Sequence, residues 1–314
     1  MQWDARIGRK IKLRDLHILL AVVQAGSMAK AGIQLAISQP AVSKAIAEME
    51  HALGVPLVDR GSRGVEPTSY GRAIIKRSLA VFDELKQGIK EIEFLSDPTV
   101  GEISIGSTEP LSAGLVTHVI DRLSSQHPLM SFQVVQGDPA TLLRYLGERD
   151  VEIVLARMSD RRVDERMNAD ILFDDAAVVV AGAQSRWIRL RRIALADLVN
   201  ERWVLSTPDS IFGRVMVKAF HDNGLEPPRG AVITLSHSMR TSLLGTGHFL
   251  SMVPAHALKF SAKHTGIRAL PIELPSTKQP IGLFTLKNRV LSPVAQLFID
   301  CVREAAKPLA KNRR

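Results

Sequence analysis

The chain has 314 residues, of which 46% are apolar, so it is long enough for about two or three domains with buried cores. No apolar run approaches the roughly 20 residues of a membrane-spanning helix, and the basic N-terminus lacks the apolar stretch of a secretory signal. We therefore expect a cytoplasmic protein with no membrane partner. The single cysteine excludes an internal disulfide, and the net charge of +9 is compatible with a polyanionic partner.

The first of three regions, residues 1–68, predicts a helix-turn-helix. Apolar residues recur at helical spacing up to Gly26, which ends the first helix. Ser27 is a favourable N-cap for a short second helix, and Ser38 is one for a longer third helix. Pro40 is tolerated in the first turn of that third helix because its missing N–H has no partner within the helix there.

The third predicted helix has the features of a helix that enters the DNA major groove. Its buried face repeats at steps of four and three from Val42 to Met49, so the polar residues at its start fall off that face. Gln39 can pair with an adenine edge, and Ser43 can pair with a base or a phosphate. Lys44 is most simply a phosphate contact that adds salt dependence to binding.

Two short extended segments around a glycine-bounded turn predict a β-wing at residues 55–67. Arg60 and Arg63 in the wing can contact phosphates or an adjacent minor groove. The alternative is a small helical bundle without a role in DNA binding. The wing, the basic leader and the long helix that follows favour DNA binding over that alternative. The residues predicted to contact DNA are Ser27, Ser38, Gln39, Pro40, Ser43, Lys44, Arg60 and Arg63.

The second region, residues 69–97, predicts one long helix with a single apolar stripe. Apolar residues continue at helical spacing from Ala73 to Ile92, and Asp97-Pro98 then breaks the helix. Such a helix needs a partner, and the simplest partner is its own copy in a second subunit. The alternative partner is the body of the same chain. We therefore predict a dimerisation helix.

The third region, residues 98–314, alternates between predicted strands and helices, which favours a doubly wound α/β domain with parallel strands. The predicted strands are residues 102–106, 132–136, 152–156, 177–181, 203–205, 232–235, 249–253 and 281–286. The predicted helices are residues 111–125, 140–148, 212–223, 239–244 and 293–306. Cys301 lies on the apolar face of the last helix, where a cysteine is usually a small core residue.

Polar side chains follow several of these strands, at the edge where open α/β sheets bind ligands. Hydroxyl and N–H groups at helix starts suit a carboxylate or another small anion, and Arg157 can bind it through two hydrogen bonds. Each hydroxyl alone can instead cap its own helix. Glu109 can stabilise a helix dipole, but it would repel an anion or favour a cationic or sugar-like ligand. The predicted effector-binding residues are Ser107, Thr108, Arg157, Thr207, His237 and Ser238.

The order of residues from Leu13 to Gly71 resembles the N-terminus of LysR-type transcriptional regulators. The residues that carry the resemblance are Leu16, Gly26-Ser27, Ala31, Leu35, Ser38-Gln39-Pro40-Ala41-Val42-Ser43, Ile46, Glu50, Leu53-Gly54-Val55-Pro56-Leu57, Arg60, Thr68 and Gly71. Ala29-Lys30 and Val58 depart from the family's usual residues, but only at packing positions.

The resemblance implies a homodimer joined by antiparallel linker helices, with dimers that often pair into tetramers. It implies interrupted palindromes in double-stranded promoter DNA as targets. It further implies a two-lobed effector domain similar to periplasmic binding proteins, with crossovers near Phe173 and Pro275. Lobe one would hold residues 99–173 and 276–314, and lobe two would hold residues 174–275. Our hypothesis for the mechanism is that the ligand closes the lobes and changes the spacing of the DNA-binding units, which alters DNA bending and the contact with RNA polymerase.

Two other classes of protein explain less of the sequence. An enzyme is disfavoured because there is no P-loop, HExxH motif, CxxC pair or nucleophile elbow, and we expect no cofactor or metal. A solute-binding protein would match the predicted C-terminal fold, but it would need export and would leave residues 1–95 without a role. The patterns are compatible with activation and with repression, and with a dimer and a tetramer.

Overall fold

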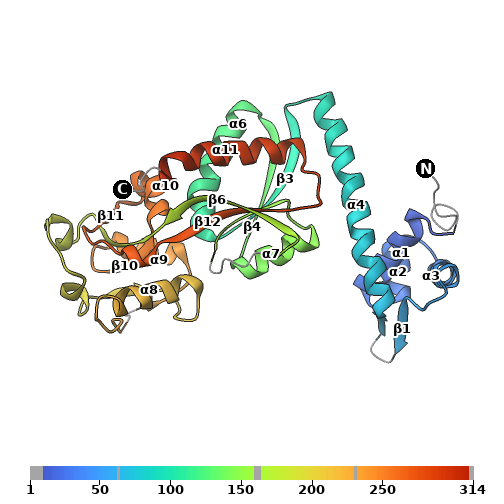
Figure 1. Cartoon of the computed structure of the whole chain (residues 1–314), viewed down its shortest axis with the longest axis horizontal. Helices are drawn as coiled ribbons and strands as arrows, with labels where there is room; N and C mark the ends of the chain where they lie inside the picture. The colour runs from blue at the N-terminus through green and yellow to red at the C-terminus, as the bar shows by residue number, and fades with distance from the viewer. Residues whose placement is uncertain (1–9, 62–63, 159–163, 230–231, 311–314) are drawn as a thin grey trace. The chain divides into compact units, whose positions relative to one another are not determined.

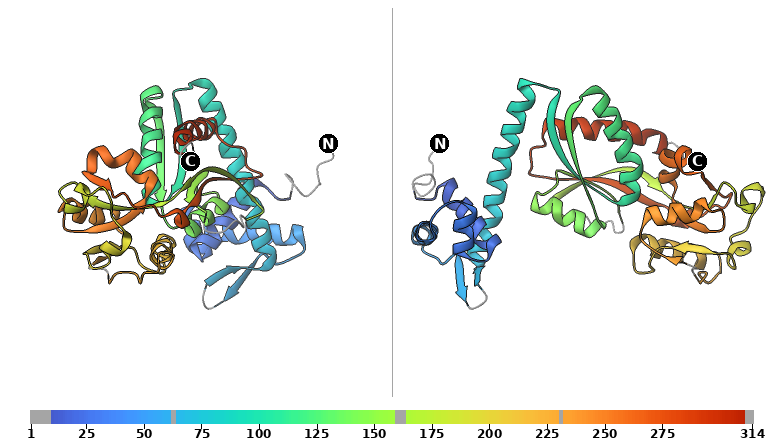
Figure 2. Two further views of the ribbon diagram at one scale, coloured as in Figure 1. Left: turned by 60° about the vertical axis from the view of Figure 1, so that its left-hand side comes forward. Right: turned by 180° about the vertical axis from the view of Figure 1, so that it is seen from behind.

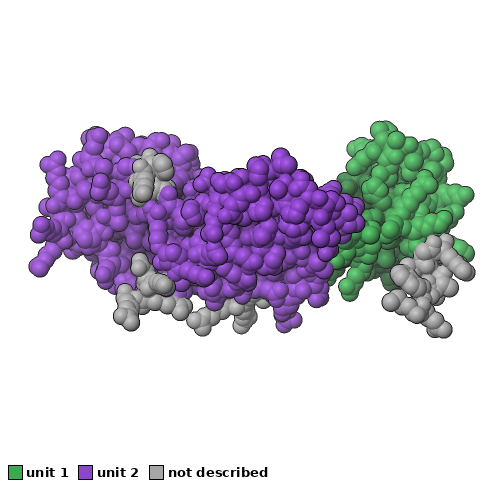
Figure 3. Space-filling view, turned by 90° about the horizontal axis from the view of Figure 1, so that it is seen from above, with its two compact units in different colours: residues 1–86 green, residues 87–314 purple. Residues whose placement is uncertain are grey.

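The computed structural model describes residues 10–61, 64–158, 164–229 and 232–310, and the chain divides into two compact units. Unit 1 ends at Lys86 and unit 2 begins at Gln87 (Figure 3). The boundary therefore falls within one long helix, Ser69–Ser96. Arg63, one of the predicted DNA contacts, lies outside the described residues.

Unit 1 is a winged helix-turn-helix followed by the first part of the long helix α4 (Figure 1). Its elements are α1 (Leu13–Ala25), α2 (Met28–Gln34), α3 (Gln39–Leu53), β1 (Val58–Gly61), β2 (Gly64–Pro67) and α4 (Ser69–Ser96). Val42, Ile46 and Met49 of α3 are buried with Leu19 and Val22 of α1 in one core, which confirms the predicted buried face of α3.

The ends of the three short helices follow from local sequence. Ser27 and Ser38 are the N-caps of α2 and α3, where their Oγ atoms accept backbone N–H groups at 3.5 and 3.4 Å. Gly26 and Gly54 adopt the left-handed conformation that ends α1 and α3. Within the described part of the chain, no single helix is long and apolar enough to cross a membrane; α1 and α2 would suffice only together, and they are bent by 118°.

Unit 2 contains two five-stranded sheets, in the strand orders β4-β3-β5-β12-β6 and β11-β7-β10-β8-β9. The first sheet is made of β3 (Val100–Ser107), β4 (Leu129–Gln136), β5 (Ile153–Arg157), β6 (Met167–Asp175) and β12 (Gln279–Leu286). The second sheet is made of β7 (Ala177–Gly182), β8 (Trp203–Leu205), β9 (Val232–Ile233), β10 (Leu250–Pro254) and β11 (Ile267–Ala269). We call the first sheet with its helices lobe one, and the second sheet with its helices lobe two.

Helices cover both faces of each sheet, because alternate residues of a strand point to opposite faces (Figures 1 and 2). In lobe one, α6 and α11 pack on one face and α7 packs on the other. In lobe two, α8 packs on one face, while α9 and α10 pack on the other. The helices are α5 (Glu109–Leu111), a π-helical turn (Ser112–Val116), α6 (Thr117–Gln126), α7 (Pro139–Glu148), α8 (Ile211–His221), α9 (His237–Gly245), α10 (Ala255–Thr265) and α11 (Pro293–Ala310). Short 3₁₀ turns are Arg186–Arg189, Leu195–Leu198 and Pro275–Thr277.

The predicted parallel strands are present, since β3 runs parallel to β4 and β5, and β8 runs parallel to β9 and β10, but both sheets are mixed. In lobe one β12 runs antiparallel to β5 and β6, and in lobe two β7 runs antiparallel to β10 and β11. These antiparallel strands arise because the chain crosses between lobes twice and returns from the opposite direction. Two strands, β6 and β11, and the helix α10 were not predicted at all.

The first crossover is at Ala176, between β6 and β7, and the second lies between β11 and β12. The sequence placed these crossovers near Phe173 and Pro275. The two segments are joined by Thr277, whose Oγ1 accepts the Ala177 N–H at 2.9 Å and donates to the Leu274 carbonyl at 2.6 Å. Thr277 is buried at this junction.

Candidate DNA-binding surface and effector crevice

The N-terminal part of α3 presents an exposed polar surface. Gln39, Pro40 and Lys44 are exposed, whereas the opposite face of the helix is buried in the core of unit 1. Lys44 lies one turn before Glu48, and its Nζ is 3.8 Å from the Glu48 Oε1. Ser43 differs from the expectation, because its half-buried hydroxyl donates to the Met28 sulfur of α2 at 3.1 Å. This side chain lies at the contact between the two helices, so its hydroxyl is already engaged.

A basic groove of about 540 Å³ runs beside this surface. Its lining combines three lysines and one histidine with two acidic residues. The lining residues are Lys10, Lys12, Asp15, Lys44, Ala47, Glu48, His51 and Ala52. The groove therefore joins the end of the basic leader to α3, and both carry positive charge that can interact with phosphates.

The wing is fastened to the helices at both ends. The Glu50 Oε1 of α3 accepts the N–H groups of Leu57 and Val58 at 2.7 and 3.3 Å, which fixes the start of β1. The Val65 N–H of β2 donates to the Gly26 carbonyl at 2.9 Å. Arg60 is exposed on β1, on a hairpin that these bonds hold in place relative to α3.

In unit 2, the predicted effector residues do not act as helix caps. Ser210 caps α8 and Ser236 caps α9, whereas the side chain of Thr108 makes no capping bond at the start of α5. The Thr207 carbonyl accepts the Ser210 hydroxyl at 2.7 Å. Ser238 Oγ is 3.1 Å from Ser236 Oγ. Because none of these predicted side chains caps a helix, the capping interpretation does not explain them.

Ser107 and Arg157 lie at strand ends as expected, but both side chains are buried and engaged. The Ser107 Oγ donates to the Thr108 carbonyl at 3.2 Å. Two Arg157 nitrogens donate to Asp175, one to its carboxylate at 2.6 Å and one to its carbonyl at 3.1 Å. Arg157 therefore holds the first crossover in place. It donates its two hydrogen bonds to Asp175 of the same chain instead of to a ligand.

Asp175 is the centre of a buried charged cluster at that crossover. Its Oδ1 accepts the backbone N–H of His256 at 2.9 Å, and its Oδ2 is 3.0 Å from the His256 Nδ1. Burial alone would raise the pKa of Asp175, but the hydrogen bonds and charge of His256 and the charge of Arg157 outweigh it, and the net pKa lies below the usual value. Burial lowers the pKa of Arg157, an effect that Asp175 opposes.

The lobes also meet between α5 and α9. Both carboxylate oxygens of Glu109 in lobe one lie within hydrogen-bonding distance of the His237 N–H in lobe two, at 3.2 and 3.3 Å. His237 is therefore brought to the lobe interface through its backbone. Nearby, Phe260 of α10 contacts His118 of α6, with ring centroids 5.4 Å apart.

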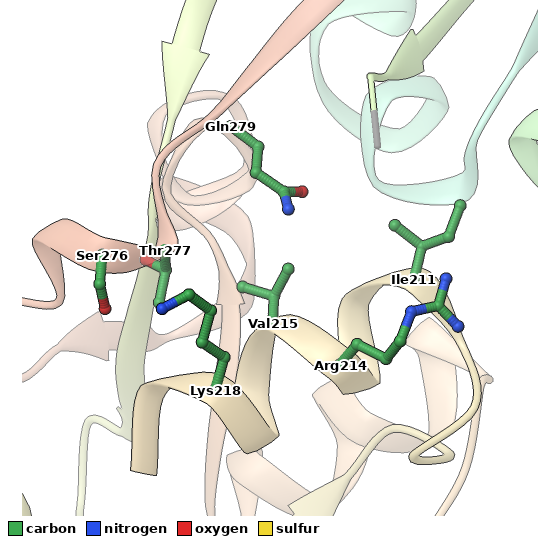
Figure 4. A pocket seen from close by; sticks show the side chains of 7 residues that line it. All are labelled: Ile211, Arg214, Val215, Lys218, Ser276, Thr277 and Gln279. Atoms are coloured by element: carbon green, nitrogen blue, oxygen red, sulfur yellow. The ribbon is translucent and has the colours of Figure 1, made fainter. Parts of the chain in front are cut away.

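A cavity of about 350 Å³ lies beside the second crossover (Figure 4). Side chains of α8 project into it from one side, and Gln279 of β12 reaches into it from the other. The lining residues are Ile211, Arg214, Val215, Lys218, Ser276, Thr277 and Gln279. The Gln279 Oε1 is buried and has no hydrogen-bond partner among the described residues. The cavity thus combines two cations with an available hydrogen-bond acceptor, between elements of different lobes.

Two family models match the chain. Residues 13–72 match the model described as "Bacterial regulatory helix-turn-helix protein, lysR family", and residues 96–307 match the "LysR substrate binding domain". The chain belongs to the LysR family. It is therefore a DNA-binding transcriptional regulator with an effector-binding domain, and not an enzyme.

Relatives of this LysR-family chain span nearly its whole length. It is 25% identical over 307 residues to the uncharacterized HTH-type transcriptional regulator YdcI of Escherichia coli (strain K12), covering 97% of this chain and 99% of YdcI. It is 27% identical over 299 residues to the regulator GbpR of Azospirillum brasilense, covering 95% and 87%. Its fold is similar to that of full-length CbnR solved with its target DNA, with a TM-score of 0.62, 19% identity, and coverage of 94% of this chain and 100% of that chain.

Sequence reasoning missed several residues of this LysR-family effector domain. None of the residues that line the cavity in Figure 4 was predicted, because they come from one helix and a crossover segment that carry no motif. Arg240 of α9, which is buried near Glu109, was not predicted, because an arginine within a helix forms no motif. Asp175 was missed because β6 itself was missed.

Proposed function

We propose that this LysR-family regulator binds promoter DNA in the cytoplasm through the start of α3 and the wing, as a dimer or tetramer. A small anionic effector bound between the lobes would change the spacing of the DNA-binding units and hence the contact with RNA polymerase. The observation that carries the proposal is that the start of α3 exposes polar side chains to solvent, while the opposite face of the same helix is buried in the core of unit 1.

The exposed groups at the start of α3 suit base and phosphate contacts. Gln39 can present its amide to an adenine edge, and Lys44 can reach a phosphate from the next turn. Ser27 and Ser38 cap their helices, so their backbone N–H groups lie at helix starts that suit phosphate oxygens. Arg60 adds a cation on the wing. Ser43 contributes packing between α2 and α3 instead of a direct base contact.

The apolar stripe of α4 supports pairing of two chains. Five large apolar side chains of this helix are exposed: Val81, Leu85, Ile89, Ile92 and Leu95. A stripe of this kind on a long helix is the pattern of a helix that packs against a second helix. Monomeric proteins rarely leave a continuous apolar surface open to water. A dimer would cover it.

The effector is expected to be a small anion because lobe two offers positive groups to the crevice from α8 and from the start of α9. Arg214 and Lys218 line the cavity beside the second crossover, and the start of α9 already carries a carboxylate from the other lobe. Helix starts and guanidinium groups are the usual partners of carboxylates and phosphates in proteins.

Footprinting with the full-length protein on the DNA upstream of its own gene tests the proposal. We expect protection of an interrupted palindrome and, at physiological salt, binding at least about a thousandfold tighter than to a scrambled duplex. Gln39→Ala should reduce this preference at one base position of each half-site and leave binding to scrambled DNA unchanged. Equal binding of wild type to native and scrambled duplexes would contradict the proposed function.

A further inference from the structure

Glu109 occupies a position that is built for an anion. Its carboxylate lies at the N-terminal end of α9, a helix of 9 residues, and both oxygens approach the N–H of His237, the first residue of that helix. The start of a helix carries partial positive charge and unpaired N–H groups. Here a side chain from lobe one fills the anion position of lobe two.

Arg240 adds a second, independent positive group behind this position. Its side chain is only 6% exposed, and one terminal nitrogen donates to the Ser206 Oγ at 2.9 Å and the Thr234 carbonyl at 3.0 Å. Its Nε has no hydrogen-bond partner among the described residues. Burial lowers the pKa of Arg240, and the charge of Glu109 opposes this effect. A buried guanidinium with a free donor is stabilised by a nearby negative charge.

We propose that Glu109 is an internal ligand of the crevice: its carboxylate holds the two lobes together at α9 until an effector carboxylate displaces it. The proposal rests on the proposed function, in which the effector binds between the lobes. It also explains how an anionic effector can bind near Glu109, which would otherwise repel it. The effector takes the place of the Glu109 carboxylate at the start of α9, so the two negative charges do not occupy the site together.

The exchange selects for the chemical class of the effector. An effector carboxylate can accept the His237 N–H in place of the Glu109 carboxylate. It then also supplies the negative charge that Arg240 requires nearby. A neutral sugar offers no charge to replace it, and a cation would be repelled by Arg240. We therefore assign the effector to the small carboxylates, with Glu109 as the residue that determines this specificity.

Hydrogen exchange of the full-length protein tests the contact without the natural effector. Overlapping peptides across residues 232–245 report on the His237 amide. In Glu109→Ala we expect this amide to exchange about tenfold faster or more, as for the loss of one hydrogen bond to a charged group. In Glu109→Gln, which keeps an acceptor but not the charge, we expect a smaller increase. Glu148→Ala is the matched control, since Glu148 pairs with Arg144 inside lobe one and its loss should leave this amide unchanged.

Rescue by a free carboxylate tests the anion position itself. With 100 mM sodium acetate against 100 mM sodium chloride, we expect acetate to restore most of the lost protection in Glu109→Ala and to change wild type little. Replacing Arg240 by Gln in the Glu109→Ala background should abolish this rescue. Unchanged exchange of His237 in Glu109→Ala, or equal effects of acetate and chloride on that variant, would overturn the proposal.

Failure of this proposal can be told apart from failure of the proposed function. The exchange and rescue experiments contain no DNA, so they report on the lobe contact alone. Glu109→Ala should still prefer the native promoter to a scrambled duplex, because the residues proposed to contact DNA lie in unit 1 and are unchanged. Loss of acetate rescue with this preference intact would contradict the internal ligand and leave the proposed function standing.

Discussion

Lys44 lies at the exposed start of α3, and its nearest charged partner is Glu48, one turn away. We predict that Lys44→Ala lowers promoter affinity about fivefold near 0.1 M salt and reduces the slope of log affinity against log salt by about 1 per subunit, because one phosphate contact is lost. Fluorescence anisotropy from 50 to 200 mM salt measures both quantities.

Arg144→Ala is the matched control for Lys44→Ala. Arg144 is also an exposed cation paired with an acid one turn later, Glu148, but it lies in lobe one and outside the cavity beside the second crossover. It should leave the affinity and the salt slope unchanged. If the slope of log affinity against log salt is the same in Lys44→Ala as in wild type, Lys44 does not contact a phosphate.

Asp175 makes stability depend on pH in a defined direction. Its pKa is lower in the folded chain than in the unfolded chain, so the ionised carboxylate stabilises the fold above a pH of about 4. That contribution is lost as the pH falls through the folded-state pKa. We predict that Asp175→Asn lowers the free energy of unfolding of unit 2 by about 3 kcal/mol at pH 7, because it leaves Arg157 buried without its countercharge.

Urea unfolding at pH 7 and at pH 3.5 checks this prediction. The difference between wild type and Asp175→Asn should shrink at the lower pH. Asp170→Asn is the control on the same strand, because its carboxylate pairs with Arg303 at the surface. It should cost less than about 1 kcal/mol at either pH. A pH-independent difference for Asp175→Asn would contradict the assigned charge.

Among the elements, α4 is attached to lobe one through a buried ion pair. Lys90 Nζ is 2.7 Å from the Glu152 Oε1, and both side chains are less than a tenth exposed. The other oxygen of Glu152 accepts the Ser292 N–H that precedes α11, at 3.4 Å. One carboxylate therefore connects the linker helix, the first sheet and the last helix of lobe one.

A double-mutant cycle on this pair has a specific expected outcome. We predict that Lys90→Met and Glu152→Gln each lower the free energy of unfolding by about 3 kcal/mol. Lys90→Met leaves the buried Glu152 carboxylate without this ammonium group, and Glu152→Gln leaves the buried Lys90 with the more distant and more exposed carboxylate of Glu102, at 3.5 Å. The double variant should cost clearly less than the sum of the two. Urea unfolding of all four proteins gives the coupling energy. Additive losses would show that the two side chains act independently, as expected for the exposed pair Arg144–Glu148.

At the scale of the whole molecule, the exposed stripe of α4 bears on assembly. We predict that Leu85→Lys converts the oligomer to monomer and lowers affinity for a palindromic promoter at least about tenfold, because a charge in a helix pair is costly to bury. Sedimentation velocity and anisotropy measure the two effects. Leu190→Lys in lobe two is the control, since Leu190 and Leu85 are both 49% exposed in the single chain. A Leu85→Lys variant that remains oligomeric would show that the subunits associate through a surface other than this stripe of α4.

The sequence predicted unit 1 well because its signals are local. Ser27, Ser38 and Gly26 act on their own helix ends, and the stripe from Val42 to Met49 repeats within a single helix. In unit 2 the strands with continuous apolar runs, such as Ile153–Arg157, were also predicted within a residue or two.

What the sequence did not predict depends on contacts between distant segments. β6 is an edge strand with many polar residues, so it carries no strong apolar pattern. Without β6, Asp175 could not be recognised as the partner of Arg157, and Arg157 was assigned to a ligand. The Glu109–His237 contact joins residues 128 positions apart, which no local pattern records.

The hydroxyl of Thr277 ties the two crossovers to each other at one buried point. Two separate connections would let the lobes shear and twist as well as swing. Because a single side chain bonds to the first crossover and to the segment just before the second, it opposes movement of one crossover relative to the other. Fewer independent motions leave less conformational entropy to lose when a molecule becomes bound between the lobes.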